Sequence, residues 1–349
     1  MSKILVTGGS GFLAGHILQQ LLTAGHAVVT TVRSEAKAQT TRATFAGLVS
    51  QKSSLDVVVV PDITQEGAFD AVAKTPGITA VLHTQSPFHF NWTDPQTGLI
   101  DPAVRGTTGL LQSVHKHAPG VRRVVVTSSF AAILSGAHLE DPQTTFTEAS
   151  WNPVTLGDIH SGPGAAYAAS KKLAEQAAFA YVRDNKAAGV AFDVVSVCPP
   201  NIFGPLASHV DSVAALNTSS QGLAALLQGE WRTAILATDG VCLWVDVRDC
   251  AQAHVKALDT AAVPSGQRLF VTAGYFSNRA IAAAVRDNFA EYADRVPGAD
   301  VAGGEAPAED KRFKFDNAAT TKLLGIEWTS LEQSTIDAVK SLQPLLAKQ

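Results

Sequence analysis

Cysteine, charge and long apolar runs are all scarce in this sequence, and each shortage excludes a class of protein. The three cysteines among 349 residues are too few for a disulfide framework and lack metal-type spacing, so we interpret Cys198, Cys242 and Cys250 as core thiols. The net charge of −4 gives nucleic acids and anionic membranes nothing to bind. No apolar run reaches the ~18 residues that would span a bilayer, and no secretory pattern precedes the apolar segment at Lys3. We therefore expect a cytosolic protein without nucleic-acid or membrane partners.

Short apolar runs alternate with helical patterns through the first two hundred residues, as a parallel sheet covered by helices on both faces requires. The expected strands are Lys3–Thr7, Ala27–Val32, Leu55–Val60, Ala80–Thr84, Arg123–Ser128 and Phe192–Cys198. The expected helices are Phe12–Ala24, Glu35–Leu48, Gly67–Lys74, Leu99–His117 and Ala165–Ala188. This order predicts an α/β fold with a Rossmann-like doubly wound parallel sheet.

The alternation ends at Pro199 and Pro200, where neither a helix nor a central strand continues easily. We expect a smaller C-terminal substrate-binding lobe to begin there. Trp244–Asp259 has the pattern of a strand followed by a helix that returns to the main sheet. The predicted division is a dinucleotide-binding domain over 1–198 plus about 236–262, and a lobe over 199–235 and 263–349.

A glycine-rich segment follows the first strand and opens the first helix, Thr7-Gly8-Gly9-Ser10-Gly11-Phe12-Leu13-Ala14-Gly15. Glycines let the backbone approach a pyrophosphate, and the free amides of the helix N-terminus stabilise its charge. We expect cofactor contacts from Gly8, Ser10, Gly11, Phe12 and Leu13. A lone motif of this kind is weak evidence, but its position in a strand-turn-helix unit strengthens it.

The end of the second strand indicates which dinucleotide binds. A site for NAD usually places an acidic residue there, whereas this sequence has Arg33, with Lys37 one turn further on. The planar donors of arginine suit the 2′-phosphate of NADP, although solvated surface charges are the alternative interpretation. Asp62 and Ile63, just after the third strand, are expected beside the adenine, and Thr84 beside the cofactor at the fourth strand. Asp62 is alternatively a helix N-cap.

Tyr167 and Lys171 open a predicted helix at a spacing of four, which puts them on one face about 6 Å apart along the axis. Reduction of a carbonyl by hydride builds negative charge on oxygen, which requires a proton donor. A phenol has an ordinary pKa near 10, so it serves near neutrality where an adjacent cation stabilises the phenolate. Ser129, with Ser128 in reserve, lies at the carboxyl end of the fifth strand, where a hydroxyl can hold the substrate oxygen.

The chain resembles the extended short-chain dehydrogenases/reductases, and within them the yeast and fungal methylglyoxal/carbonyl reductases and plant dihydroflavonol reductases. The matching segments are TGGSGFLAGH at 7–16, TVRS at 31–34, DIT at 62–64, HTQSPFHF at 83–90, DPAVRGTTGLL at 101–111, RRVVVTSSFAA at 122–132, YAASKKLAEQAA at 167–178 and PPNIFGP at 199–205. The resemblance implies that Ser129, Tyr167 and Lys171 are catalytic. It also implies that Lys171 holds the nicotinamide ribose and that Pro199 lies beside the nicotinamide.

The predicted function is reduction of small or aromatic aldehydes and ketones by NADPH, in a monomer or a homodimer. Phe88, Phe130, Asn201 and Phe203 are the expected pocket residues, with Trp151 and Trp231 as further candidates. His83 and His89, which flank the cofactor loop, are interpreted as structural. The alternatives are an NAD-dependent nucleotide-sugar epimerase or dehydratase, and a regulator that binds NADP without turnover.

Overall fold

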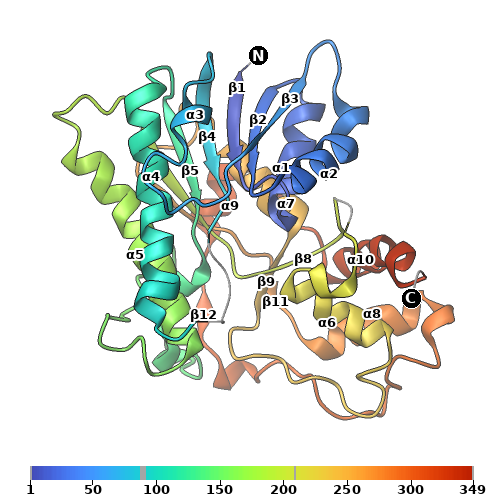
Figure 1. Cartoon of the computed structure of the whole chain (residues 1–349). Coiled ribbons are helices and arrows are strands. Elements are labelled where there is room, and N and C mark those ends of the chain that lie inside the picture. The colour runs from blue at the N-terminus through green and yellow to red at the C-terminus, as the bar shows by residue number, and fades with distance from the viewer. Residues whose placement is uncertain (1, 87–91, 208–209, 348–349) are drawn as a thin grey trace.

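A seven-stranded parallel sheet forms the centre of the computed structural model, which describes residues 2–86, 92–207 and 210–347 (Figure 1). The strands of this sheet are β1 (Lys3–Thr7), β2 (Ala27–Val32), β3 (Ser54–Val59), β4 (Ile78–His83), β5 (Arg123–Thr127), β7 (Asp193–Cys198) and β10 (Arg268–Phe270). Their order across the sheet is β10-β7-β5-β4-β1-β2-β3, and every neighbouring pair is parallel. The order reverses between β1 and β4, which creates the crevice at which such sheets bind ligands.

Helices cover both faces of this sheet because the strands are apolar on both faces. In β1, Ile4 and Val6 pack into one core while Leu5 packs into the opposite one. The first face carries α1 (Phe12–Thr23), α2 (Glu35–Phe45), α7 (Val247–Lys256) and α9 (Ala318–Leu324). The second face carries α3 (Asp70–Ala73), α4 (Asp101–His117) and α5 (Pro163–Asp184). The two cores hold the sheet rigid, so that the ends of its strands keep fixed positions.

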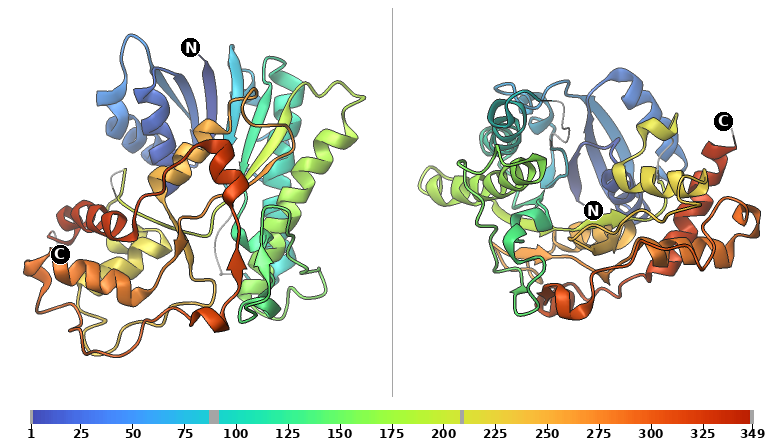
Figure 2. Two further views of the ribbon diagram at one scale, coloured as in Figure 1. Left: turned by 180° about the vertical axis from the view of Figure 1, so that it is seen from behind. Right: turned by 90° about the horizontal axis from the view of Figure 1, so that it is seen from below.

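A lobe with its own apolar core lies beyond the carboxyl ends of the strands (Figure 2). Its helices are α6 (Thr218–Leu227), α8 (Asn278–Asn288) and α10 (Leu331–Leu346). A small sheet in the order β11 (Gly274–Tyr275), β9 (Leu243–Asp246) and β8 (Asn201–Phe203) joins the lobe to the main domain, and a second small sheet pairs β12 (Lys314–Phe315) with β6 (Thr145–Phe146). Shorter turns are the π-helical η2 (Gln96–Ile100) and the 3-10 turns η1 (Ala46–Leu48), η3 (Phe130–Ala132), η4 (Gly136–His138), η5 (Val213–Ala215), η6 (Ala290–Tyr292) and η7 (Glu309–Lys311).

The fold class predicted from the sequence is confirmed, and the six predicted strands of the main sheet begin and end within two residues of the observed ones. The segment Trp244–Asp259 contains a strand and a helix, β9 and α7, and α7 packs on the main sheet as expected. β9 belongs to the small sheet, and Arg268–Phe270 is the segment that pairs with β7. The domain limits themselves stay a prediction. The three cysteines are buried and unpaired, in agreement with their interpretation as core thiols.

Candidate active site

Tyr167 and Lys171 lie together near the start of α5. The helix begins with Pro163 in its first turn, a position where the missing N–H of proline has no helical partner to lose. The spacing of four residues brings the Lys171 Nζ to 5.6 Å from the centroid of the Tyr167 ring. Both side chains are half-buried. The geometry therefore gives the phenol a close cation in a partly desolvated setting, where charge interactions are stronger than in water.

Ser129 follows β5 and is held between two backbone hydrogen bonds, one to the end of β7 and one to the residue that follows it. Ser128 N donates to Val197 O at 2.8 Å, and Phe130 N donates to Pro199 O at 2.8 Å. The structure thus brings Ser129 and Pro199, two predicted site residues, to neighbouring strand ends. The Ser129 Oγ accepts from Ala131 N at 3.1 Å as the N-cap of η3, and η3 packs against α5.

The reserve candidate Ser128 is committed elsewhere. Its hydroxyl is buried and donates to Glu175 Oε2 at 2.6 Å. Glu175 also accepts from Ser196 Oγ at 2.6 Å and from Arg268 Nε at 2.7 Å. This buried network ties α5 to β5, β7 and β10, and it fixes the register of the Tyr167 helix against the strand end that carries Ser129.

The sequence analysis missed Glu175, although a signal was present. Glu175 follows Lys171 by four residues and Tyr167 by eight, so all three share one face of α5. A carboxylate is rarely buried unless it is paired, and a face that already carries two functional side chains was the place to look for its partner. The partner, Arg268, lies 93 residues away and could not be located from local pattern.

The glycine-rich turn has the close packing expected of a pyrophosphate cradle. Gly8 adopts a φ of +77°, which side chains rarely tolerate. A Cβ on Gly9 would lie 2.2 Å from Thr30 Oγ1, so no other residue fits there. Gly11 caps α1 without any side-chain hydrogen bond, and the first turn of this helix carries no acidic residue. The amides of Gly8, Gly9 and Gly11 already donate to Thr31 Oγ1, Thr31 O and Gly8 O, respectively. Those of Ser10, Phe12 and Leu13 make no hydrogen bond to any described residue, so they can bind an anion and the turn fits a dinucleotide.

Arg33 and Lys37 lie beside this turn, at the end of β2 and in the first turns of α2. Arg33 is exposed, and within the part of the chain that the structure describes neither side chain makes a hydrogen bond or an ion pair. Ser34 caps α2, accepting from Lys37 N at 3.3 Å. Two unengaged cations at this edge suit a phosphate better than a ribose hydroxyl pair.

The remaining predicted cofactor residues lie along the same sheet edge. Asp62 is exposed, and its Oδ1 accepts from both Thr64 N at 2.8 Å and Thr64 Oγ1 at 2.7 Å, which lowers the pKa of the carboxyl. Asp62 is therefore not the N-cap of the next helix, which was the alternative for it, because the N-cap of α3 is Phe69. Ile63 is buried against α4, where Gly106 leaves room for it. The Thr84 hydroxyl donates to Thr7 O at 2.6 Å, next to the glycine turn.

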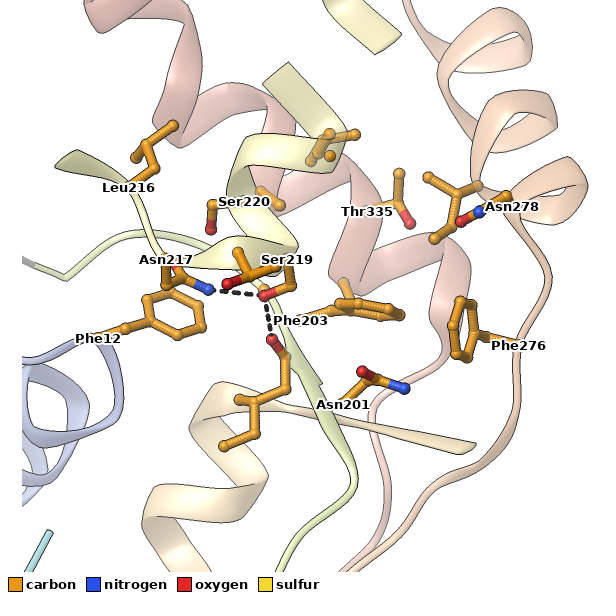
Figure 3. Close-up of a pocket in the computed structure, with 18 of the residues that line it drawn as sticks. Phe12, Asn201, Phe203, Leu216, Asn217, Ser219, Ser220, Phe276, Asn278 and Thr335 are labelled. Atoms are coloured by element: carbon orange, nitrogen blue, oxygen red, sulfur yellow. Dashed lines mark hydrogen bonds between the residues drawn. The ribbon is translucent and has the colours of Figure 1, made fainter. Parts of the chain in front are cut away.

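A cavity of about 650 Å³ lies between the start of α1 and the lobe (Figure 3). Aromatic side chains form much of its wall, namely Phe12, Phe203, Trp231 and Phe276. The predicted pocket residues Asn201 and Phe203 lie in this wall, and Phe203 stacks edge-to-face on Phe276 with ring centroids 4.8 Å apart. Ser129, Tyr167 and Lys171 are outside the wall, but Pro200 and Asn201 follow Pro199 directly and connect the two sites.

Two polar atoms in the cavity wall are buried without a hydrogen-bond partner among the described residues, Asn217 Oδ1 and Ser334 Oγ. The Asn217 Nδ2 is occupied, since it donates to Ser219 Oγ at 2.6 Å. Unpaired buried polar groups are unfavourable, which makes these atoms candidates for contacts with a bound molecule. Among the described wall residues no lysine or arginine is present, and Asp239 is the one acidic side chain.

The predictions for the other pocket residues had different outcomes. Phe130 is 1% exposed and stacks on Phe270 in an aromatic cluster, with ring centroids 5.0 Å apart, so the structure places it in the core instead of the pocket wall. The η3 turn directs the Phe130 side chain into this aromatic cluster. Phe88 and His89 lie outside the described residues. Trp151 is exposed with Arg268 stacked on its ring, whereas Trp231 lines the cavity.

Neither a metal cluster nor a membrane span was found in the described residues. They contain no group of three or more histidine, cysteine or acidic side chains that could hold a metal ion. None of the described helices combines the length and the apolar character needed to cross a bilayer.

Comparison with known proteins shows the family to which the chain belongs. The model of the NAD dependent epimerase/dehydratase family matches residues 4–271, and the chain belongs to this family. The resemblance to extended short-chain dehydrogenases/reductases is thereby confirmed.

Several relatives within this family are similar to the chain over nearly its whole length. The chain is 41% identical over 341 residues to a ketoreductase, azaE, of Aspergillus niger, covering 97% of both proteins. It is 37% identical over 342 residues to a putative NADPH-dependent methylglyoxal reductase, GRP2, of Candida albicans, covering 98% of both. The solved structure of the yeast methylglyoxal/isovaleraldehyde reductase Gre2 with NADPH matches with a TM-score of 0.88 at 33% identity, over 99% of this chain and all of that one. These relatives span the lobe as well as the sheet.

Proposed function

We propose that this protein is an NADPH-dependent carbonyl reductase, with Tyr167 as proton donor, Lys171 as the cation that favours the phenolate, and Ser129 as the hydroxyl that holds the substrate oxygen. The observation that carries the proposal is the Lys171 ammonium 5.6 Å from the Tyr167 ring, on a helix packed against the turn that Ser129 caps. Relatives of 41% and 37% identity that carry reductase names support the reaction class.

Each residue has a separate task in the reduction. NADPH, when bound, supplies a hydride to the carbonyl carbon. The Ser129 Oγ donates a hydrogen bond to the carbonyl oxygen and orients it, while Tyr167 transfers its phenolic proton to that oxygen as negative charge develops. The Lys171 ammonium stabilises the phenolate that is left. Glu175 takes no part in the chemistry, but its network holds α5 in place.

The cofactor site supports NADPH over NADH. The Gly8–Gly11 turn and the open N-terminus of α1 would hold the pyrophosphate, and Arg33 and Lys37 would pair with the 2′-phosphate. Lys171 would also contact the nicotinamide ribose, and Pro199 would line the nicotinamide. NADPH in the name or title of several relatives agrees with this assignment.

The aromatic cavity is the proposed binding site for the substrate beyond its carbonyl group. Its wall suits an uncharged molecule with an aromatic or branched apolar part, oriented by one or two polar contacts. A nucleotide sugar carries a diphosphate, which a wall whose described residues include no lysine or arginine would bind poorly. This observation, together with Arg33, disfavours the epimerase or dehydratase alternative.

The decisive experiment compares two tyrosines of the same helix. Tyr167→Phe should reduce the rate of carbonyl-dependent NADPH oxidation at least ~100-fold, the usual scale for a positioned general acid. NADPH affinity, measured by fluorescence titration, should change little. Tyr181→Phe is the matched control, because Tyr181 also lies on α5 but its hydroxyl contacts His115 at 3.1 Å, away from the site.

A panel of aldehydes and ketones, aromatic ketones and methylglyoxal included, separates the remaining functions. If no member accelerates the loss of NADPH absorbance while NADPH binds, the regulator alternative gains. Protein that purifies with tightly bound NAD would instead revive the epimerase. Full activity of Tyr167→Phe would remove the assigned mechanism.

A further inference from the structure

His83 presents a buried polar atom that the mechanism does not yet use. It ends β4, it is 4% exposed, and its Nδ1 lies 2.8 Å from Thr7 Oγ1. The other ring nitrogen, Nε2, is buried and has no hydrogen-bond partner among the described residues. An unpaired nitrogen in such a place is unfavourable and calls for an explanation.

The hydrogen bonds around Thr7 indicate which nitrogen of His83 carries the proton. The Thr7 hydroxyl oxygen accepts from Gln85 N at 3.3 Å and lies 2.8 Å from His83 Nδ1, and donation to Nδ1 is the arrangement that gives the hydroxyl proton a partner among the described residues. The Nδ1 therefore acts as the acceptor, so the proton of the neutral ring is on Nε2. Burial and the nearby Lys171 ammonium lower the pKa of His83 to about 3, which keeps the ring neutral in the working range.

His83 lines a small cavity of about 20 Å³ together with Lys171. About 10–15 Å³ suffices for one water molecule, provided that two to four polar groups surround it. The other polar side chains of the wall come from different elements, namely Gln85, Ser86, Thr107, Thr127, Ser128 and Glu175. Lys171 and Glu175, both on α5, are the charged side chains facing this cavity within the described part of the chain.

We propose that His83 is a positioning residue, whose Nε2 and the Lys171 Nζ share one buried water molecule that fixes the ammonium beside Tyr167. Lys171 makes no side-chain hydrogen bond to any described residue. No hydrogen bond from this part of the chain therefore fixes the position of its ammonium. The water accepts from both nitrogens and donates to hydroxyl or carboxylate oxygens of the wall. This inference rests on the proposed function, because it assigns Lys171 its catalytic task.

Two substitutions separate the two nitrogens of His83. The amide nitrogen of glutamine reaches about as far as Nε2, and that of asparagine only about as far as Nδ1. His83→Asn should lower kcat about tenfold, which corresponds to one lost hydrogen bond to a charged group, and should move the alkaline limb of the pH–rate profile to higher pH. His83→Gln should restore most of kcat and the normal profile. His254→Gln is the matched control, since His254 is equally buried but both its nitrogens are paired, with Thr127 and Cys250.

A crystal structure of the wild-type protein, at a resolution that shows ordered water, tests the geometry without activity. A water within about 2.7–3.2 Å of both His83 Nε2 and Lys171 Nζ supports the proposal, and a dry cavity overturns it. An unchanged kcat and pH profile in folded His83→Asn also overturns it while leaving the reductase assignment intact. If the wild type reduces no carbonyl, the function fails and the crystallographic water still decides the inference. If His83→Asn does not fold, the glutamine variant and the crystal structure decide it.

Discussion

Removal of one partner from the Glu175–Arg268 pair should destabilise the protein strongly. The two side chains are 2% and 8% exposed, and their charged atoms lie 2.7 Å apart. Glu175→Gln keeps the size and leaves the Arg268 guanidinium buried beside a neutral amide. Breaking a buried ion pair in this way costs about 3–5 kcal/mol, because the remaining charge loses its compensation.

The size of the chain determines how far this loss of unfolding free energy lowers the melting temperature. An unfolding entropy of about 2.1 cal/mol/K per residue means that this 349-residue chain loses about 1.4 °C for each kcal/mol. The expected decrease for Glu175→Gln is about 4–7 °C, measured by calorimetry at neutral pH. Arg183→Gln is the control, because Arg183 and Asp184 form an exposed pair whose loss should leave the melting temperature unchanged.

A double-mutant cycle tests whether the pair itself is responsible. Arg268→Met alone should be as destabilising as Glu175→Gln, whereas the double variant should lose at least about 1 kcal/mol less than the two single losses together. Additive losses, or single losses below about 1 kcal/mol, would refute the reasoning. Since Glu175 also binds the hydroxyl of Ser128, next to Ser129, kcat should fall in the glutamine variant even below its melting temperature.

Two further predictions concern the cofactor and pH. Arg33→Asp should raise the KM for NADPH by about 10–100-fold and that for NADH far less, as steady-state kinetics with both cofactors will show; equal effects would place the 2′-phosphate elsewhere. Burial lowers the pKa values of His83 and His254 to about 3 and about 4 from 6.5. Because the unfolded chain binds these protons first, stability is complete above about pH 6.5 and falls by roughly 1.4 kcal/mol per histidine for each pH unit below it. The melting temperature should therefore decrease from about pH 7 to pH 5, with a shallower slope in His254→Gln, and a flat profile would contradict this.

The main sheet was predictable because its strands are long and apolar and are separated by helices with clear ends. Gly25, for example, follows α1 with a φ of +82° and marks the end of that helix in the sequence. β10 contains three residues, too few to show any periodicity, and it joins the sheet only through its pairing with β7. Its place depends on tertiary contacts, which explains why the sequence did not indicate a strand there.

The site residues likewise fall into two groups, those whose arrangement depends on local spacing and those whose arrangement depends on contacts between distant segments. The Tyr167–Lys171 pair and the glycine turn depend on spacing within one helix or one turn, and spacing is visible in a sequence. The direction of a side chain that follows a strand is not visible in a sequence. Phe130 was therefore expected in the pocket, whereas it lies in the aromatic core. Glu175 has a local signal in its place on the Tyr167–Lys171 face, but its partners Arg268 and Ser196 come from distant segments and could not be located from local pattern.

The candidate catalytic residues and the cavity wall lie on separate parts of the molecule, and this separation affects how the substrate range can change. Ser129 and Tyr167 rest on the sheet and on α5, whose cores and ion pair involve residues outside the cavity wall. The cavity wall is largely formed by the lobe, which has a core of its own around Trp231 and Phe276. The short segment Pro199–Asn201 links the two parts. Under the proposed function, replacement of lobe residues can therefore reshape the cavity while the proposed proton donor keeps its geometry, which would allow one reaction to serve differently shaped carbonyl compounds.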